Sequence, residues 1–263
     1  MPTTTARGSV QRILSAVTST ADKDPLHSPS VGMTVRIQSE SVFGFSRNPQ
    51  GTVWVEGSTI PIVPGAALFD LDRNGGTRPS PAYGYHAAED VSGAPMREGS
   101  VGAGAGACCA GGNLSQRCPG GIGTWAMKFG TYTVGACAAV NAYGVVRDID
   151  GGRWFPCPQE DLLSPERSKV GVDNNTTLVV VATDYPLSRS RLGVIARMAG
   201  AGIARAIYPA FTPFDGDIVF AASTGKDTNA TVTPDLLSRL GHAAAECVYA
   251  SILRGVGLRG RNP

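Results

Sequence analysis

The sequence predicts a mixed α/β fold, and three observations carry this prediction. Apolar and β-branched runs at residues 132–149, 176–187 and 215–224 are typical of buried strands. Two further segments, 188–208 and 233–253, begin with residues that favour helix starts, and the first of them carries an apolar stripe. No unit of about 20–50 residues repeats along the chain, which excludes a solenoid. The order strand, helix, strand, helix after residue 176 therefore indicates a compact layered unit.

The N-terminal part of the chain has weaker signals. Residues 1–40 show little periodicity and many Ser, Thr and Pro, so we expect a loose arm or a poorly packed edge. Residues 58–71 (STIPIVPGAALFDL) predict a short buried strand, a Pro-Gly turn and a second apolar segment. A turn-rich crossing follows at residues 79–86, and residues 84–91 (GYHAAEDV) predict the start of a helix.

Later elements are marked more sharply. Residues 132–149 predict a strand with a turn at 142–144, and residues 150–175 are polar and irregular. Ser188 is expected to cap the next helix. The apolar stripe of that helix comprises Leu192, Ile195, Met198 and Ile203. The triplet 233–235 (Thr-Pro-Asp) places Pro in the first turn of a final helix that ends near Leu253.

Charge and hydropathy exclude several classes of partner. The 263 residues carry a formal net charge of +2 at pH 7, so neither nucleic acid nor a membrane surface is an expected partner. No apolar run reaches the about 18 residues of a spanning helix. The N-terminus lacks the continuous apolar core of a secretory signal, so we expect the cytoplasm.

The cysteines and the glycine-rich run suggest packing roles. Six cysteines are too sparse for a disulfide scaffold, and we interpret them as small reduced core residues rather than metal or redox groups. The run at 98–112 (EGSVGAGAGACCAGG) lacks the Lys-Ser/Thr of a phosphate-binding loop and the spacing of a dinucleotide motif. We expect close backbone packing there, and we predict neither a cofactor nor a metal.

The junction between Asn175 and Thr176 carries the main chemical hypothesis. A threonine hydroxyl is a poor nucleophile without a base, but a threonine at a chain start has its own α-amine for that purpose. A mid-chain Thr176 reaches this state only if the preceding peptide bond is cut. An irregular polar loop that leads into a rigid strand, VDNN before TTLVVVATD, suits such a cut. The alternative is an ordinary boundary between a loop and a strand.

Two downstream carboxylates strengthen the hypothesis. Asp215 and Asp217 flank Gly216, which would let the backbone turn sharply so that both could point from a strand edge. One carboxylate could orient the threonine hydroxyl through other groups, and two close carboxylates push their pKa values apart. The alternatives are an Asp-Gly turn or a calcium loop, and the calcium pattern fails for lack of further acceptors.

These residues resemble a known family. The stretch from NNTTLVVVATD to PFDGDIVFAASTG looks like the nucleophile chain of the DmpA-type aminopeptidases and nylon-oligomer hydrolases. IPIVPGAALFDL, EGSVGAGAGA, GGIGT and TVGACAAVNAYG look like the larger chain of the same family. The resemblance covers roughly residues 58 to 255. It implies a four-layer α/β/β/α sandwich, a precursor that cuts itself, and two pieces that stay associated.

The resemblance also implies roles for individual residues. Thr176 corresponds to the nucleophile, Asn175 to the residue before the cut, and Asp215 with Asp217 to the carboxylate pair of the nylon-oligomer hydrolases. Asn141 is similar to the asparagine that helps to hold the oxyanion, although a turn residue is the plainer interpretation. The implied division is a divergent segment 1–57, a larger chain 58–175 and a smaller chain 176–263.

Three functions follow as hypotheses. The first is an amidohydrolase that acts on N-terminal amino-acid amides, small peptides or ω-amino-acid oligomers. The second is an acyltransferase similar to the ornithine acetyltransferases. The third is a non-cleaving relative, because residues 1–57 differ from the family's usual opening strands and the lysine that often follows its glycine-rich run is absent here. The resemblance implies a homo-oligomer, a tetramer or larger.

Overall fold

The computed structural model describes residues 52–55, 58–61, 65–71, 73, 78–110, 117–155, 175–225 and 230–258. The arm expected over residues 1–40 and most of the stretch 150–175 lie outside these ranges. Of the divergent segment 1–57, the structure describes strand β1, Thr52–Val55, which forms an antiparallel hairpin with β2, Ser58–Pro61. The strand predicted at the start of residues 58–71 is therefore confirmed.

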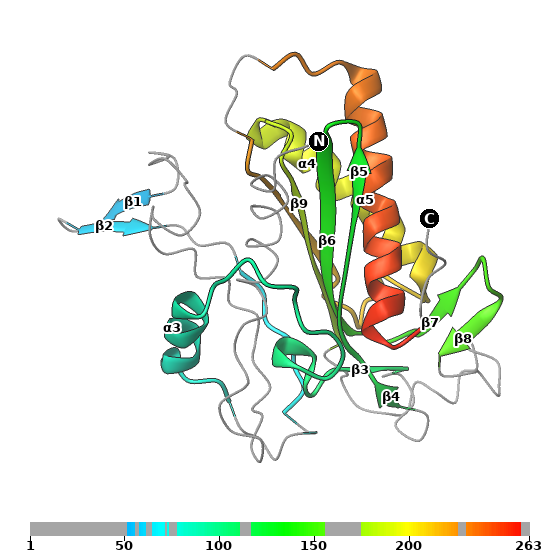
Figure 1. The fold of residues 1–263 in the computed structure, drawn as a ribbon. Coiled ribbons are helices and arrows are strands. Elements are labelled where there is room, and N and C mark those ends of the chain that lie inside the picture. The colour runs from blue at the N-terminus through cyan, green and yellow to red at the C-terminus, as the bar shows by residue number, and fades with distance from the viewer. Residues whose placement is uncertain are drawn as a thin grey trace.

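A four-stranded sheet forms the centre of the fold, in the order β11-β9-β6-β5 (Figure 1). Its strands are β5 (Gly121–Phe129), β6 (Tyr132–Asn141), β9 (Thr176–Thr183) and β11 (Ile218–Ser223). β6 is antiparallel to β5 and β9, whereas β11 is parallel to β9. A parallel pair needs a crossover connection, and the chain between β9 and β11 makes it through helix α4 (Arg189–Ala206).

Helices α4 and α5 (Pro234–Gly255) cover one face of this sheet (Figure 1). The final helix is capped by Thr233, whose Oγ1 accepts the Leu236 N–H at 3.2 Å. Ser188 is the N-cap of α4, as predicted, although its side chain makes no cap hydrogen bond. Its hydroxyl instead shares a hydrogen bond with that of Ser190, at the exposed surface.

Glycines allow helix α5 to approach both the sheet and helix α4 closely. A Cβ on Gly123 of β5 would lie 2.0 Å from the Ser251 carbonyl oxygen of α5, and one on Gly202 of α4 would lie 2.3 Å from the Ala245 carbonyl oxygen. Backbone atoms cannot yield by such amounts, so these positions exclude side chains. β5 was not predicted as a strand, because its glycines obscure the strand pattern.

The opposite face of the sheet packs against the segment 65–110. Alternation along β9 sends Thr177, Val179 and Val181 toward the helices and Leu178 and Val180 toward this second side. The second core cluster includes Leu68, Ala103, Ile122, Cys137, Ala139, Leu178, Val180 and Ala182. The helix expected to start within 84–91 is α3, Pro81–Glu89, which begins earlier because Pro fits the first turn.

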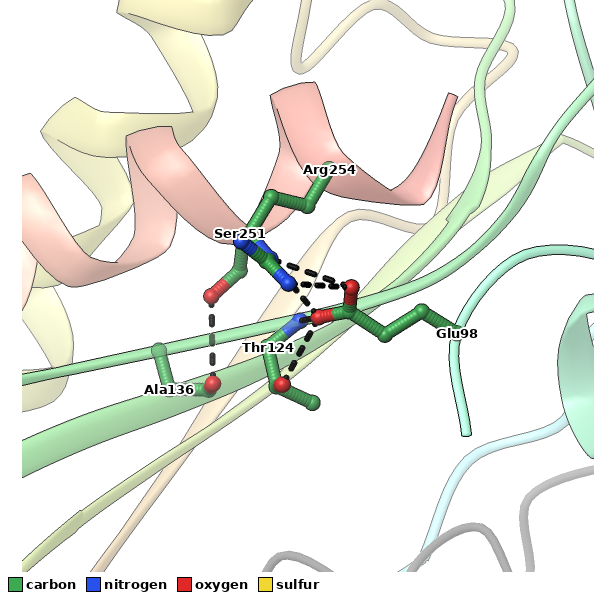
Figure 2. Close-up of polar contacts among 5 residues, drawn as sticks. All are labelled: Glu98, Thr124, Ala136, Ser251 and Arg254. Atoms are coloured by element: carbon green, nitrogen blue, oxygen red, sulfur yellow. Dashed lines mark hydrogen bonds and ion pairs between the residues drawn. The ribbon is translucent and has the colours of Figure 1, made fainter. Parts of the chain in front are cut away.

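The glycine-rich run packs closely, as predicted. Its 3₁₀ turn η2 (Gly102–Gly104) is buried, and a Cβ on Gly104 would lie 2.6 Å from the Gly99 carbonyl oxygen. Glu98, at the start of the run, joins it to β5 and α5 (Figure 2). The Glu98 carboxylate accepts the N–H and the hydroxyl of Thr124, each at 2.8 Å, and the Arg254 guanidinium at 2.7 and 2.8 Å.

Short strands complete the edges. β3 (Cys108–Cys109) pairs with β4 (Cys118–Pro119), and a three-stranded sheet has the order β10-β7-β8. Its strands are β10 (Ile207–Tyr208), β7 (Val145–Asp148) and β8 (Arg153–Phe155). The strand and turn predicted over 132–149 are β6, residues 142–144 and β7. β8 lies in the stretch expected to be irregular, which corrects that expectation.

The mixed α/β class is confirmed. The part of the chain that the structure describes supplies one helical layer and the sheet beneath it, which is half of the expected four-layer sandwich. None of the helices in the described ranges combines the length and the hydropathy that a membrane span requires.

Candidate active site

Thr176 is the first residue of β9 and lies opposite Asn141, the last residue of β6. Directly opposed residues of an antiparallel pair point to the same side, so both lie on the face away from helices α4 and α5. The Thr176 hydroxyl donates to the carbonyl oxygen of Asn175 at 2.5 Å. The candidate nucleophile is therefore already beside the peptide group that it is expected to attack.

The Asn175 backbone is held by the loop that carries the two carboxylates. Its N–H donates to the Phe214 carbonyl at 3.3 Å, and its carbonyl oxygen accepts the Gly216 N–H at 2.9 Å. Asn175 and Asp215 form an isolated parallel bridge, so the loop adds one rung ahead of β11. The carbonyl at the expected cut thus already has a backbone donor, which would stabilise negative charge on its oxygen.

Gly216 has a second role, which sequence reasoning did not identify. A Cβ at this position would lie 2.8 Å from the Thr176 Oγ1. The expectation from sequence was a sharp turn between the carboxylates, whereas the structure requires the glycine for its close approach to the Thr176 hydroxyl. The Asp-Gly-Asp pattern could have indicated this, because a glycine between two functional residues often marks a close backbone contact.

The two carboxylates are held by backbone N–H groups. The Oδ1 of Asp217 accepts the Thr177 N–H at 2.8 Å, and its Oδ2 accepts the Phe211 N–H at 2.9 Å. Asp217 therefore positions Thr177, the residue that follows Thr176. In the described ranges the Thr176 hydroxyl bonds to the Asn175 carbonyl rather than to either carboxylate. Any effect of the carboxylates on the hydroxyl is indirect in this arrangement.

Asp215 binds the turn between β6 and β7. Its Oδ1 accepts the Tyr143 N–H at 3.1 Å, and its Oδ2 accepts the Thr212 hydroxyl at 2.6 Å. Burial and the nearby Asp217 charge raise the pKa of the Asp215 carboxyl, although these hydrogen bonds act in the opposite sense. The loop before β11, which carries Asp215 and Asp217, therefore links the turn after Asn141 to the start of β9.

Asn141 lies beside Thr176, but the partners of its amide are other residues. It is 1 % exposed, its Oδ1 accepts the Cys108 N–H at 3.0 Å, and its Nδ2 donates to the Phe69 carbonyl at 3.2 Å. The donor on the Asn175 carbonyl is Gly216, not Asn141. The oxyanion role of Asn141 stays a prediction, and the interpretation as a simple turn residue does not apply, since Asn141 ends a strand.

Aromatic rings border the site. Tyr143 stacks on Phe214 with ring centroids 5.2 Å apart, and Phe214 is 48 % exposed. The two rings come from the segments that Asp215 joins. Sequence reasoning missed this pair, because the stacking joins residues 143 and 214, which are distant along the chain.

The described residues include no group of three or more His, Cys, Asp or Glu that could hold a metal ion. Within the described ranges, Cys109, Cys137 and Cys247 are buried and carry free thiols. Burial raises the pKa of the Cys247 thiol to about 12, so this thiol stays protonated at neutral pH.

A comparison with protein families shows to which family the chain belongs. The model of the family described as Peptidase family S58 matches residues 30–258. The chain belongs to Peptidase family S58. The match extends into the segment 1–57, although most of that segment lies outside the described residues.

Curated S58 relatives include two mycobacterial proteins, each named as an uncharacterized aminopeptidase. The protein from Mycobacterium bovis is 37% identical over 231 residues, which cover 78% of this chain and 65% of the relative. The protein from Mycobacterium leprae is 34% identical over 278 residues, which cover 89% of this chain and 74% of the relative. The chain thus spans 65% of the length of the first of these relatives.

Solved structures of similar proteins support the S58 fold. A β-aminopeptidase from Burkholderia is 26% identical with a TM-score of 0.51, covering 72% of this chain and 53% of that one. An L-aminopeptidase D-Ala-esterase/amidase from Ochrobactrum anthropi, described as a variant of the Ntn hydrolase fold, is 24% identical with a TM-score of 0.51. This second alignment covers 69% of this chain and 51% of that one. The chain therefore has the Ntn hydrolase type of fold.

Proposed function

We propose that this S58 chain cuts itself between Asn175 and Thr176 and then hydrolyses amide bonds with Thr176 as its N-terminal nucleophile. One observation carries the proposal most directly. The Thr176 hydroxyl contacts the Asn175 carbonyl oxygen at 2.5 Å, and the same oxygen accepts the Gly216 N–H at 2.9 Å. A nucleophile and an oxyanion donor therefore meet at one peptide group.

The cut would proceed through an ester. The Thr176 hydroxyl oxygen attacks the Asn175 carbonyl carbon, and negative charge develops on the oxygen held by Gly216. The bond between that carbon and the Thr176 nitrogen breaks, and the nitrogen takes up the proton that the hydroxyl loses. Water then hydrolyses the ester, which leaves an Asn175 carboxylate and a Thr176 with a free hydroxyl and a free α-amine.

Turnover would use the same oxygen. The free α-amine of Thr176 accepts the hydroxyl proton, the hydroxyl attacks a substrate amide, and the amine part of the substrate leaves with a proton. Water completes the reaction by hydrolysing the acyl ester. Because an α-amine titrates at roughly pH 7.7–8.0, activity should rise with pH through this range. A donor such as the Gly216 N–H contributes about 3 kcal/mol to such a step.

The two fragments should remain together after the cut. Thr176–Thr183 pairs with Val134–Asn141 along eight register positions, so β9 of the smaller chain stays in the sheet beside β6 of the larger chain. The implied chains are residues 58–175, with the segment 1–57 ahead of them, and residues 176–263. A homo-oligomer of such units, acting in the cytoplasm, is part of this proposal.

The substrates proposed are amides of N-terminal amino acids, small peptides or ω-amino-acid oligomers. The names of the relatives support the first class, since they are an L-aminopeptidase with D-Ala-esterase/amidase activity and a β-aminopeptidase. An acyltransferase would use the same ester but pass the acyl group to an amine. Adding an amine acceptor during turnover separates the two, because hydrolysis gives the free acid and transfer gives a new amide.

The decisive test is the fragment pattern of the purified protein. We expect two bands on a denaturing gel, with N-terminal sequencing of the smaller one starting at Thr176. Thr176→Ala should give one band, and Thr177→Val, the neighbouring control, should still give two. A single persistent band for the unaltered chain would overturn the proposal and favour the non-cleaving alternative. A cut that survives in Thr176→Ala would move the nucleophile elsewhere.

A further inference from the structure

The side chain of Asn175 is enclosed in an unusual way. Asn175 is 4 % exposed, and its Nδ2 is buried without a hydrogen-bond partner among the residues that the structure describes. Buried polar groups in folded proteins are nearly always paired, because an unpaired one loses its hydration and gains nothing in return. The surroundings therefore enclose the Asn175 side chain but offer no acceptor, within the described ranges, to its Nδ2.

The same enclosure is connected to the proposed chemistry. The ester formed during the cut has the Asn175 acyl group on the Thr176 oxygen. The ester formed during turnover has a substrate acyl group on that same oxygen. In the proposed reaction, Asn175 therefore supplies the first acyl group that is bound to the Thr176 oxygen. The Asn175 carbonyl oxygen already accepts the Gly216 N–H. Its side chain marks the direction that the substituent of a substrate acyl group would take.

We propose that the space filled by the Asn175 side chain becomes the acyl side-chain subsite of the processed enzyme, and that this subsite selects an uncharged, apolar group of leucine size. The proposal rests on the function proposed above. Leucine and asparagine side chains have the same number of non-hydrogen atoms and branch at the same carbon, so a leucine side chain follows the course of the asparagine side chain. The leucine side chain leaves no donor unpaired there, whereas an asparagine side chain must lose its hydration.

Matched substrates test this directly. The processed protein is assayed with the 4-nitroanilides of leucine, asparagine, lysine and tryptophan, and kcat/KM is measured from release of 4-nitroaniline. The leucine substrate should exceed the asparagine substrate by about tenfold or more, since an unpaired buried amide carries a penalty of that order. The charged lysine and the larger tryptophan substrates should also be slower than leucine.

The outcomes separate the two proposals. If the denaturing gel shows no cut, the proposed function fails and the subsite fails with it. If the cut occurs and the asparagine, lysine or tryptophan amide has a kcat/KM equal to that of the leucine amide, the subsite alone is overturned. A processed protein that hydrolyses none of the four amides overturns the subsite, whereas the hydrolase is overturned only if small peptides and ω-amino-acid oligomers are not hydrolysed either.

Variants of the precursor give a second measurement. Asn175→Leu should be cut at a rate within about threefold of the unaltered chain, because the same enclosure surrounds this side chain before and during the attack. Asn175→Trp should be cut at least about tenfold more slowly, because the indole exceeds the available volume. Equal rates for both variants would show that the enclosure does not constrain the acyl side chain, and would overturn the subsite.

Discussion

Replacement of Glu98 by glutamine should destabilise the fold by removing the junction between the glycine-rich run, β5 and α5. The Glu98 carboxylate accepts the Arg254 Nη2 at 2.7 Å and the Arg254 Nε at 2.8 Å, as well as two donors of Thr124 (Figure 2). A glutamine amide keeps one acceptor but turns an NH₂ group toward the guanidinium. Arg254 then keeps its charge without the opposite charge beside it.

The magnitude follows from the exposure of the pair. Breaking a fully buried ion pair costs about 3–5 kcal/mol, whereas an exposed pair is worth about 0–1 kcal/mol. The side chains of Arg254 and Glu98 are 36% and 23% exposed, which places this pair between the two limits. We therefore expect Glu98→Gln to lower the free energy of unfolding by about 2 kcal/mol at pH 7.

The effect should depend on pH in a defined direction. Burial alone would raise the pKa of Glu98, but the hydrogen bonds from Arg254 and Thr124 outweigh it and lower the pKa below 4.5. A carboxylate with a lowered pKa stabilises the fold above its unfolded pKa, and this contribution is lost as the pH falls through the folded pKa. The difference between the unaltered protein and Glu98→Gln should therefore be largest near neutral pH and shrink in acid.

Urea denaturation measures this difference. Both proteins carry Thr176→Ala, so that each remains one chain and can be compared as such. The matched control is Glu89→Gln, since Glu89 contacts His86 at the surface with side chains 54% and 62% exposed, and its effect should stay under about 0.5 kcal/mol. The reasoning is refuted if Glu98→Gln costs no more than this control, or if its cost is the same at pH 7 and in acid.

Further expectations concern the core, measured in the same Thr176→Ala background. Thr177→Val should stabilise the fold by about 1 kcal/mol and raise the Tm, because the buried Thr177 hydroxyl has no hydrogen-bond partner in the described part of the chain. A lower Tm would contradict this. Gly123→Ala should destabilise the fold by about 3 kcal/mol, because a Cβ would lie 2.0 Å from the Ser251 carbonyl oxygen. If urea denaturation gives a loss in the free energy of unfolding below about 1 kcal/mol, α5 can shift to accommodate the methyl group. Tyr249→Phe should cost about 1–2 kcal/mol by the same assay, since the Tyr249 hydroxyl donates to buried Asp148 at 3.0 Å, and an unchanged stability would argue against this bond.

Local patterns were sufficient for the elements with strong periodicity. The β-branched run after Thr176 predicts β9, and the Thr-Pro-Asp triplet predicts the start of α5, because strand and helix preferences act over a few neighbouring residues. The same patterns failed at β5, where glycines needed for contact with α5 conceal a nine-residue strand. At Ser188 they located the start of α4 correctly, although the Ser188 hydroxyl bonds to Ser190 rather than to the helix backbone.

The candidate site shows the same division. Residue type and context, together with the family resemblance, indicated Thr176, Asp215 and Asp217. The donor on the Asn175 carbonyl and the partners of Asn141 depend on which segments meet at the ends of strands. No local pattern encodes such meetings, because they join residues separated by tens of positions.

By itself, the sequence determined where the strongly periodic strands and helices form and which residue types could perform nucleophilic chemistry, because periodicity and side-chain chemistry are properties of short segments. Tertiary structure decided that Gly216 rather than Asn141 donates to the Asn175 carbonyl, and that Asp217 positions the strand start through Thr177. It also decided that the Asn175 amide nitrogen is buried without a partner within the described ranges. These outcomes depend on sheet register and on the loop before β11, which are set by packing of the whole core rather than by any one segment.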